Sequence, residues 1–181
     1  MELGYIGLGA MGGALARRLM LSKKLRVYDL RPDVMDAFAA NGAIPQQSPA
    51  ALARECDVVM LCLPRSADVR EAIFGDGGLA EGLTPGKIVI DQTSGDPDET
   101  RDMAAALKEL GVTLMDAPVS GGPRGADAGT IAIIAAGPQD AFEQVKSVYE
   151  SISPNVFYCG DTGNGHVIKL VNNTIGACNR I

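Results

Sequence analysis

Apolar residues along this chain gather in short runs, and longer stretches with apolar residues three and four positions apart lie between them. These short runs, in which Arg26 is the one charged residue, have the length of strands and lie at residues 3–6, 25–28, 58–63, 88–90, 112–115 and 131–135. The stretches with helical spacing lie at residues 11–21, 33–40, 49–55, 67–74, 97–110, 139–151 and 166–181. Asp96 before Pro97 has the form of a helix N-cap followed by proline in the first turn. The pattern therefore predicts strands that alternate with helices.

The fold class follows from the character of these strands. A run that is apolar at every position is buried on both faces, which is typical of a parallel sheet covered by helices. We therefore predict an α/β fold with a doubly wound, mostly parallel sheet of the Rossmann type over residues 1–162. Loop-forming residues at 159–165 close this domain, and the helix after them ends without a glycine cap. We expect residues 163–181 to begin a second, all-α domain of which only the first helix is present.

A glycine-rich turn connects the first predicted strand to the first predicted helix. It consists of Gly7, Leu8, Gly9, Ala10, Met11 and Gly12. In this spacing the first glycine permits a sharp turn, the second lets phosphates approach the backbone, and the third lets helix and strand pack closely. The helix N-terminus adds free N–H groups and the positive end of its dipole. The turn predicts a dinucleotide site, and the alternative is a turn that only connects two elements.

The end of the second predicted strand carries a candidate for ribose recognition. Asp29 stands where dinucleotide-binding sheets place a carboxylate that hydrogen-bonds the adenosine ribose, and Leu30 and Arg31 follow it. This carboxylate favours NAD, because it repels the 2′-phosphate of NADP. Arg31 keeps NADP open, since a guanidinium can recruit that phosphate. The alternative role for Asp29 is to cap the helix that begins near Pro32.

Two further strand ends belong to the same predicted crevice. Leu63 and Pro64 close one strand, and the segment 91–94, which contains Thr93 and Ser94, follows another. Ligands of open α/β sheets gather at the carboxyl ends of strands, so these turns are candidates for holding the nicotinamide half of a cofactor. Taken alone, each turn is equally well explained as a loop with a helix cap.

The segment after the strand at 112–115 presents a hydroxyl beside two consecutive glycines, Ser120, Gly121 and Gly122. Unobstructed backbone N–H groups with a hydroxyl alongside can hold a carboxylate. A flexible loop followed by a helix cap has the same composition. Both interpretations stay open at this stage.

The last predicted helix carries two polar side chains on one face. Lys169 and Asn173 are four residues apart, so both can reach one small ligand, and Gly176 and Arg180 share their face. The opposite face is formed by Val167, Leu170, Val171, Thr174, Cys178 and Ile181.

A lysine opposite an apolar stripe is ordinarily solvated. Two features argue for a role in chemistry: the glycines at 163 and 165 let the helix start close to the sheet, and an ammonium beside an amide suits a hydroxyl substrate. We expect Lys169 to be the catalytic residue. His166, the one histidine of the chain, is expected to be a helix-start residue rather than a catalyst.

Composition limits the partners of these sites. The 181 residues include 22 acidic and 16 basic side chains, and the formal charge of −6 argues against nucleic acid or an anionic membrane as a partner. No apolar run approaches the length of a membrane span, and no group of residues indicates a metal site. The four cysteines show no C-x-x-C pairing, which favours a reducing cytoplasm.

Three of these segments together resemble the signatures of the β-hydroxyacid dehydrogenase family, which includes 3-hydroxyisobutyrate dehydrogenase and the tartronate semialdehyde and glyoxylate reductases. Residues 7–12 resemble its cofactor signature, residues 116–122 its substrate-binding signature, and residues 163–173 its catalytic signature. The order and spacing agree over essentially the whole chain. The segment 91–94 departs slightly, because the family more often reads Ser-Thr where this chain has Thr93 and Ser94.

The resemblance implies an NAD(P)-dependent oxidoreductase that transfers a hydride between nicotinamide and the β-carbon of a small 3-hydroxy acid or its semialdehyde. It implies that Lys169 is the general acid and base and that Asn173 orients the substrate. It further implies that the substrate carboxylate binds to Ser120, Gly121 and Gly122. NAD is the expected cofactor, with NADP as the alternative.

The family continues into an all-helical domain that closes the cleft and builds the dimer. We therefore expect a homo-oligomer at full length and an inactive fragment here. One alternative is an NADPH-preferring reductase of glyoxylate, succinic semialdehyde or tartronate semialdehyde. The other is a module that senses a dinucleotide without any hydride transfer.

Overall fold

The computed structural model describes residues 1–179, so Arg180 and Ile181 of the predicted last helix lie outside the described residues. Its main sheet has six strands in the order β3-β2-β1-β4-β5-β6, and every neighbouring pair is parallel. The strands are β1 (Leu3–Ile6), β2 (Leu25–Tyr28), β3 (Ile44–Pro45), β4 (Val58–Leu61), β5 (Ile88–Asp91) and β6 (Thr113–Asp116). The order reverses between β1 and β4, as in a doubly wound sheet. The predicted fold class is confirmed.

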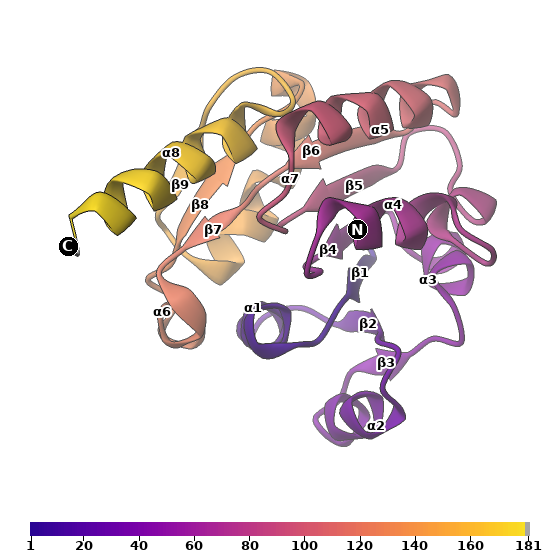
Figure 1. The fold of residues 1–181 in the computed structure, drawn as a ribbon. Coiled ribbons are helices and arrows are strands. Elements are labelled where there is room, and N and C mark those ends of the chain that lie inside the picture. Colours follow the sequence, from indigo (N-terminus) through magenta and orange to yellow (C-terminus); the bar gives the residue numbers. More distant parts are fainter. Residues whose placement is uncertain (180–181) are drawn as a thin grey trace.

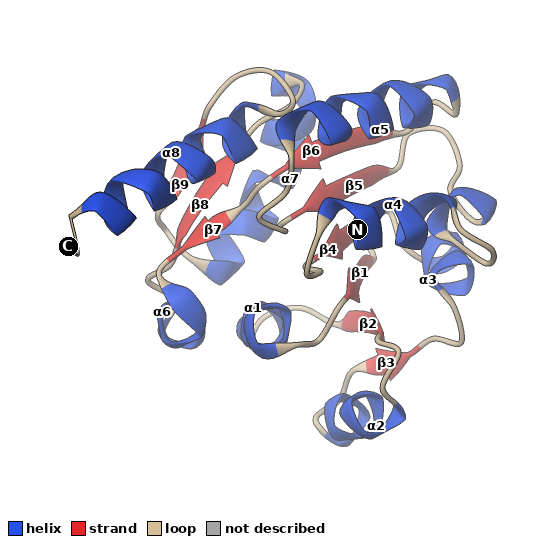
Figure 2. Cartoon of the chain, viewed as in Figure 1, coloured by secondary structure: helices blue, strands red, loops and turns tan. Residues whose placement is uncertain are grey.

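Helices cover both faces of this sheet (Figure 2). They are α1 (Ala10–Met20), α2 (Pro32–Ala40), α3 (Pro49–Glu55), α4 (Ser66–Phe74), α5 (Pro97–Glu109) and α7 (Gln139–Ile152), with a short 3₁₀ turn, η1 (Leu79–Glu81). Asp96 caps α5 as predicted, because its Oδ1 accepts hydrogen bonds from the N–H groups of Asp98 and Glu99.

The central strands β1, β4, β5 and β6 are largely apolar because each one contributes to two separate cores. Leu3 and Tyr5 of β1 point into the core beneath α1 and α7, whereas Ile6 points into the core beneath α3, α4 and α5. The alternation is the period of two that a pleated strand imposes. Burial on both faces fixes the register of the strands, so the carboxyl ends of β1, β4, β5 and β6 meet at one edge of the sheet.

The predicted strand at 131–135 does not join the main sheet, and in this respect the prediction was wrong. It forms β8 (Ala132–Ala135), which pairs antiparallel with β7 (Val119–Ser120) and parallel with β9 (Val156–Tyr158) in a separate three-stranded sheet. β6 ends at Asp116, two residues before Pro118, which has no N–H to continue a ladder. A short helix, α6 (Gly122–Ala128), connects β7 to β8.

The last helix, α8 (Asn164–Cys178), packs against α5, β6 and β8 (Figure 1, yellow). Its orientation is the reverse of what its apolar stripe indicates. Gly165, His166 and Lys169 are its buried residues, whereas Leu170 and Val171 of the apolar face are 44% and 52% exposed. The polar face that carries Lys169 is therefore turned toward the sheet, at least over the first two turns of the helix.

Candidate functional site

A cavity of about 740 Å³ lies at the carboxyl ends of β1, β2 and β4, where the strand order of the sheet reverses. Most of the predicted cofactor residues line it: Gly7, Gly9, Ala10, Met11, Gly12, Asp29, Leu30, Arg31, Leu63 and Pro64. Leu8, Thr93 and Ser94 do not line it. Ser120, Lys169 and Asn173 also lie outside the cavity wall. The predicted site therefore has two parts, a cavity at β1, β2 and β4 and a second group of residues on β7 and α8.

The three glycines of the turn have different reasons to be glycine. Gly7 has a φ of +89°, and a Cβ there would collide with the carbonyl oxygen of Cys62. A Cβ on Gly12 would collide with the carbonyl oxygen of Gly7. Gly9 is different, because its φ is −65° and a Cβ there would meet nothing within 4 Å. The protein itself leaves the space above Gly9 open, and this open space fits a phosphate that approaches the backbone closely.

Hydrogen-bond donors face this open space. Within residues 1–179, the N–H groups of Ala10 and Met11 at the start of α1 have no acceptor. Both residues line the cavity. Unpaired N–H groups and the positive end of the helix dipole attract an anion. The observed cradle thus fits the pyrophosphate of a dinucleotide.

Asp29 is held in place beside the glycine-rich turn. Its Oδ2 accepts a hydrogen bond from the Leu8 N–H at 2.7 Å, and its Oδ1 accepts from the Arg31 N–H and from Arg31 Nε, both at 3.0 Å. Burial alone would raise the pKa of this carboxyl, but these hydrogen bonds outweigh burial and lower the pKa below its ordinary value. Asp29 does not cap α2, which has no side-chain cap. An ionised carboxylate therefore stands at the rim of the cavity, paired with Arg31.

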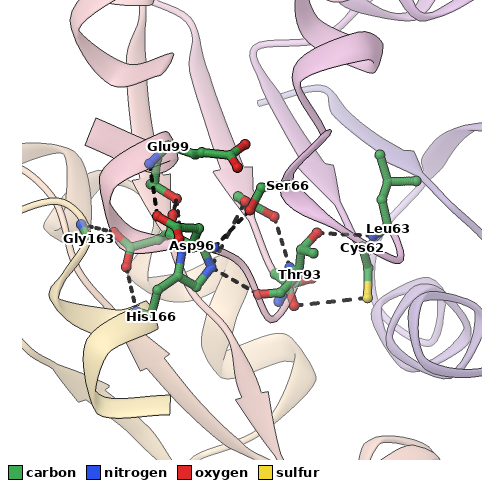
Figure 3. Close-up of polar contacts among 12 residues, drawn as sticks. Cys62, Leu63, Ser66, Thr93, Asp96, Glu99, Gly163 and His166 are labelled. Atoms are coloured by element: carbon green, nitrogen blue, oxygen red, sulfur yellow. Dashed lines mark hydrogen bonds and ion pairs between the residues drawn. The ribbon is translucent and has the colours of Figure 1, made fainter. Parts of the chain in front are cut away.

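Thr93 supports the cavity from behind. The Leu63 N–H donates to Thr93 Oγ1 at 3.1 Å, and the Thr93 N–H donates to Asp91 Oδ1 at 2.9 Å (Figure 3). Thr93 is buried, whereas Ser94 is exposed. The end of β5 is thereby joined to the loop after β4, which forms a wall of the cavity.

The Ser120 segment lies beside α8. Ser120 ends β7, and Gly121 and Gly122 have φ values of +138° and +69°, so both positions favour glycine. Ser120 Oγ accepts a hydrogen bond from Nδ2 of Asn172 at 3.2 Å. Asn172 and the neighbouring Asn173, which is predicted to orient the substrate, are both exposed. The signal for Asn172 is only the pair of consecutive amides, and the sequence alone does not show which of the two reaches Ser120.

Lys169 is buried one turn before Asn172. Its exposed fraction is 9%, and no hydrogen bond or ion pair within residues 1–179 involves its ammonium group. Burial lowers the pKa of this lysine, because the charged form loses hydration. The predicted close start of the helix is confirmed, since a Cβ on Gly165 would collide with the carbonyl oxygen of Ile134.

Two buried carboxylates anchor the strand ends near this helix. Asp116, at the end of β6, accepts hydrogen bonds from the N–H groups of Gly163 at 2.6 Å and His166 at 2.9 Å. Asp91, at the end of β5, is fully buried, and its Oδ2 lies 4.0 Å from His166 Nε2. Burial raises the pKa of Asp91, and the nearby imidazole opposes that shift. The sequence signal for both residues is an acidic side chain at the end of an apolar run.

The sheet, the glycine-rich turn and the carboxylate at the end of β2 define an α/β domain built to bind a dinucleotide. Residues 2–160 match the family described as the NAD binding domain of 6-phosphogluconate dehydrogenase. The chain belongs to the β-hydroxyacid dehydrogenase family within this group of NAD(P)-binding proteins, which confirms the predicted family.

Two relatives and one solved structure illustrate the similarity. The chain is 37% identical over 174 residues to the probable mitochondrial 3-hydroxyisobutyrate dehydrogenase of Dictyostelium discoideum, covering 96% of this chain and 54% of the relative. It is 35% identical over 180 residues to the 2-hydroxy-3-oxopropionate reductase of Escherichia coli K12, covering 99% and 61%. The 3-hydroxyisobutyrate dehydrogenase of Mycobacterium tuberculosis superposes with a TM-score of 0.91 at 29% identity, covering 98% and 61%.

The chain thus spans between 54% and 61% of the length of these relatives. Among residues 1–179, no helix is long and apolar enough to cross a membrane.

Proposed function

We propose that the protein is an NAD(P)-dependent dehydrogenase of small 3-hydroxy acids in which Lys169 is the general acid and base. The burial of Lys169 is the observation that carries this proposal. A helix with an apolar stripe ordinarily buries that stripe, yet α8 exposes it and buries a lysine that has no ion pair within the described residues. Burying an unpaired cation is costly, and such positions are common at functional sites.

The proposed cofactor residues are those that line the cavity, with the pyrophosphate at the Ala10 and Met11 N–H groups and the adenosine ribose at Asp29. When bound, the nicotinamide accepts or supplies the hydride. The Leu63 and Pro64 wall and Thr93 behind it support the nicotinamide half in this proposal. NAD is the favoured cofactor because Asp29 is ionised and because Arg31 is already paired with it.

Lys169 moves the proton in this proposal. A lysine is ordinarily too basic to accept a proton near neutral pH, and the burial of Lys169 shifts its pKa in the direction that this task requires. The neutral amine takes the hydroxyl proton when the substrate is oxidised. The ammonium returns it to the carbonyl oxygen when the substrate is reduced.

The substrate carboxylate is assigned to Ser120, Gly121 and Gly122. This assignment is supported by the contact of Ser120 with α8, which brings the hydroxyl to the helix of Lys169. Asn173 is proposed to orient the substrate, and Asn172 to position Ser120.

The domain limits, the oligomeric state and the cellular location of the protein are part of the same proposal. The dinucleotide domain is taken as residues 1–162 and the second domain as starting at residue 163, which is supported by the family match over 2–160 and by the start of α8 at Asn164. A homo-oligomer is proposed from the family resemblance. A cytoplasmic location is proposed because the four cysteines at 56, 62, 159 and 178 are all free thiols.

The test is to measure turnover of small 3-hydroxy acids and their semialdehydes by the full-length protein with both cofactors. The same measurement is then made on the Lys169→Ala variant. Loss of general acid–base catalysis is expected to lower kcat by about 10²- to 10⁴-fold. The dissociation constant for the cofactor should stay within about twofold, because Lys169 lies outside the cavity wall. Near-normal turnover by Lys169→Ala would refute the assignment.

A further inference from the structure

The proposed mechanism gives no role to His166, although its side chain is fully buried. The imidazole contacts two other elements (Figure 3). Nε2 lies 2.9 Å from the carbonyl oxygen of Thr93, and Nδ1 lies 2.9 Å from the hydroxyl of Thr100 on α5. Its backbone N–H donates to Asp116 at the end of β6. The first turn of α8 is therefore tied to three parts of the sheet domain through one residue.

The direction of the Nε2 contact is fixed by chemistry. A carbonyl oxygen only accepts hydrogen bonds, so Nε2 carries a hydrogen and donates it to Thr93. The direction of the Nδ1 contact is not fixed in this way. The Thr100 hydroxyl lies 2.9 Å from Nδ1 and 2.8 Å from the carbonyl oxygen of Asp96, and its single hydrogen can be donated to either one. Of the two ring contacts, the bond to Thr93 has a single possible direction.

Thr93 also contacts the wall of the cofactor cavity. Its hydroxyl accepts the Leu63 N–H, and Leu63 lines the cavity. A line of hydrogen bonds thus runs from Leu63 through Thr93 to His166. Lys169 follows three residues later on the same buried face of α8, and residues at this spacing are neighbours on a helix surface. The bond between His166 and Thr93 therefore joins the two parts of the site.

The charged groups around this junction come from three elements. Asp91 of β5 lies 4.0 Å from His166 Nε2, and Asp116 of β6 accepts the His166 N–H. Arg101 of α5 lies next to Gly163, where it would contact an added Cβ, and pairs with Asp98. None of these groups replaces the Nε2 contact, because each is bound elsewhere or lies beyond hydrogen-bond distance of the ring.

We propose that the hydrogen bond from His166 Nε2 to the Thr93 carbonyl sets the position of Lys169 relative to the cofactor cavity. His166 is then a positioning residue, which acts through Lys169 and does not touch substrate or cofactor. The inference rests on the proposed role of Lys169 as general acid and base.

Two substitutions at His166 separate the two ring contacts. In His166→Gln, the side-chain amide reaches the position of Nε2 and can still donate to Thr93. In His166→Asn, the shorter amide reaches only the position of Nδ1. Thr100→Val is the matched control, since it removes the partner of Nδ1 and leaves the Thr93 contact.

In the full-length protein, His166→Asn is expected to lower kcat by about 10- to 100-fold, because a shift of about 1 Å in a catalytic group costs that much. His166→Gln and Thr100→Val should stay within about threefold of the wild type, and KM for the cofactor should stay within about twofold in all three. Equal losses of kcat in His166→Gln and His166→Asn, or no loss in either, overturn the proposal. If His166→Asn does not fold, the kcat of His166→Gln still decides: retention supports the proposal and loss overturns it.

The pH profile of kcat/KM gives a readout that a merely structural role does not move. Burial lowers the pKa of Lys169, so a helix turn that is less firmly docked should let that pKa rise toward the ordinary lysine value. The inflection set by Lys169 should move upward in His166→Asn and stay in place in His166→Gln. An inflection that is unchanged in His166→Asn contradicts the proposal.

Amide hydrogen exchange on the 181-residue chain separates failure of this inference from failure of the proposed function. His166→Asn should exchange faster than His166→Gln at residues 167–169, whether or not the protein turns over a hydroxy acid. If Lys169→Ala keeps full activity, the proposed function fails. The exchange rates still show whether the hydrogen bond from His166 to Thr93 holds the first turns of α8 in place. Equal exchange in the two variants overturns it.

Discussion

A substitution at Gly9 is expected to weaken cofactor binding without changing the stability of the fold. A Cβ at Gly9 meets no atom within 4 Å and its φ of −65° suits any residue, so Gly9→Ala strains nothing in the protein. We expect the free energy of unfolding to change by about 1 kcal/mol or less, since only the N-cap preference and the entropy of the unfolded chain are altered. The added methyl occupies the space through which a phosphate reaches the Ala10 and Met11 N–H groups. Gly9→Ala should therefore fold normally and bind the cofactor poorly.

The loss of affinity can be estimated from those two donors. A hydrogen bond to a charged acceptor contributes about 1.5 kcal/mol or more, so losing both costs about 3 kcal/mol. This corresponds to a rise of about 100-fold in the dissociation constant for NAD(P). Isothermal titration measures the affinity, and urea unfolding of the same samples measures the stability.

Gly12→Ala is the matched control, because its Cβ would collide with the carbonyl oxygen of Gly7 inside the packing of α1 on β1. It should lose about 1–3 kcal/mol of stability. Wild-type affinity in Gly9→Ala would show that the phosphates do not approach this turn, and the cofactor site would have to be placed elsewhere.

Three further outcomes follow from the charges of the site. Asp29→Asn should raise the affinity for NADP relative to NAD by about tenfold or more, because it removes a negative charge and frees Arg31 from its ion pair. Parallel titrations with both cofactors measure this ratio of affinities, and an unchanged ratio would contradict the prediction. Asp116→Asn should lower the free energy of unfolding by about 1.5–3 kcal/mol, because the NH₂ group of the asparagine replaces one of the two oxygens that accept the Gly163 and His166 N–H groups. Urea unfolding measures this change, and an unchanged midpoint would contradict the prediction. The pKa of Lys169 is lowered in the folded state, so the unfolded chain binds more protons between that pKa and about 10.4. The stability of the wild type relative to Lys169→Met should therefore rise as the pH is raised through this window, and a pH-independent difference would contradict it.

The main sheet is predictable because its strands are buried on both faces. β1 and β2 coincide with the predicted residues, and β4, β5 and β6 are found with ends displaced by two residues or fewer. The short elements leave no such pattern. β3 and β7 have two residues each, which is too few to form a pattern. β9 does lie in an apolar run, residues 156–159, but Phe157 is 56% exposed, so this strand is not buried on both faces. α6 has seven residues that include two glycines and a proline, which a composition argument assigns to a loop.

The contacts that organise the site are beyond the reach of spacing rules because they join distant segments. The cofactor turn is local, and its glycines indicate their roles in the sequence. The bonds from Asn172 to Ser120 and from His166 to Thr93 span 52 and 73 residues. These residues come together only because α8 packs against β6 and β8, which belong to the two different sheets.

The reversed orientation of α8 has a consequence for the chemistry. Val167, Leu170 and Val171 of its apolar face are between 40% and 52% exposed, and an exposed apolar stripe on a helix is typical of a contact surface. The polar groups of the site all come from the other face and from the sheet domain. Covering the part of Lys169 that is still exposed, which lies on that other face, would exclude more water from its ammonium group and lower its pKa further. Such covering would therefore act in the same direction as the burial already present, toward a lysine that exchanges protons near neutral pH.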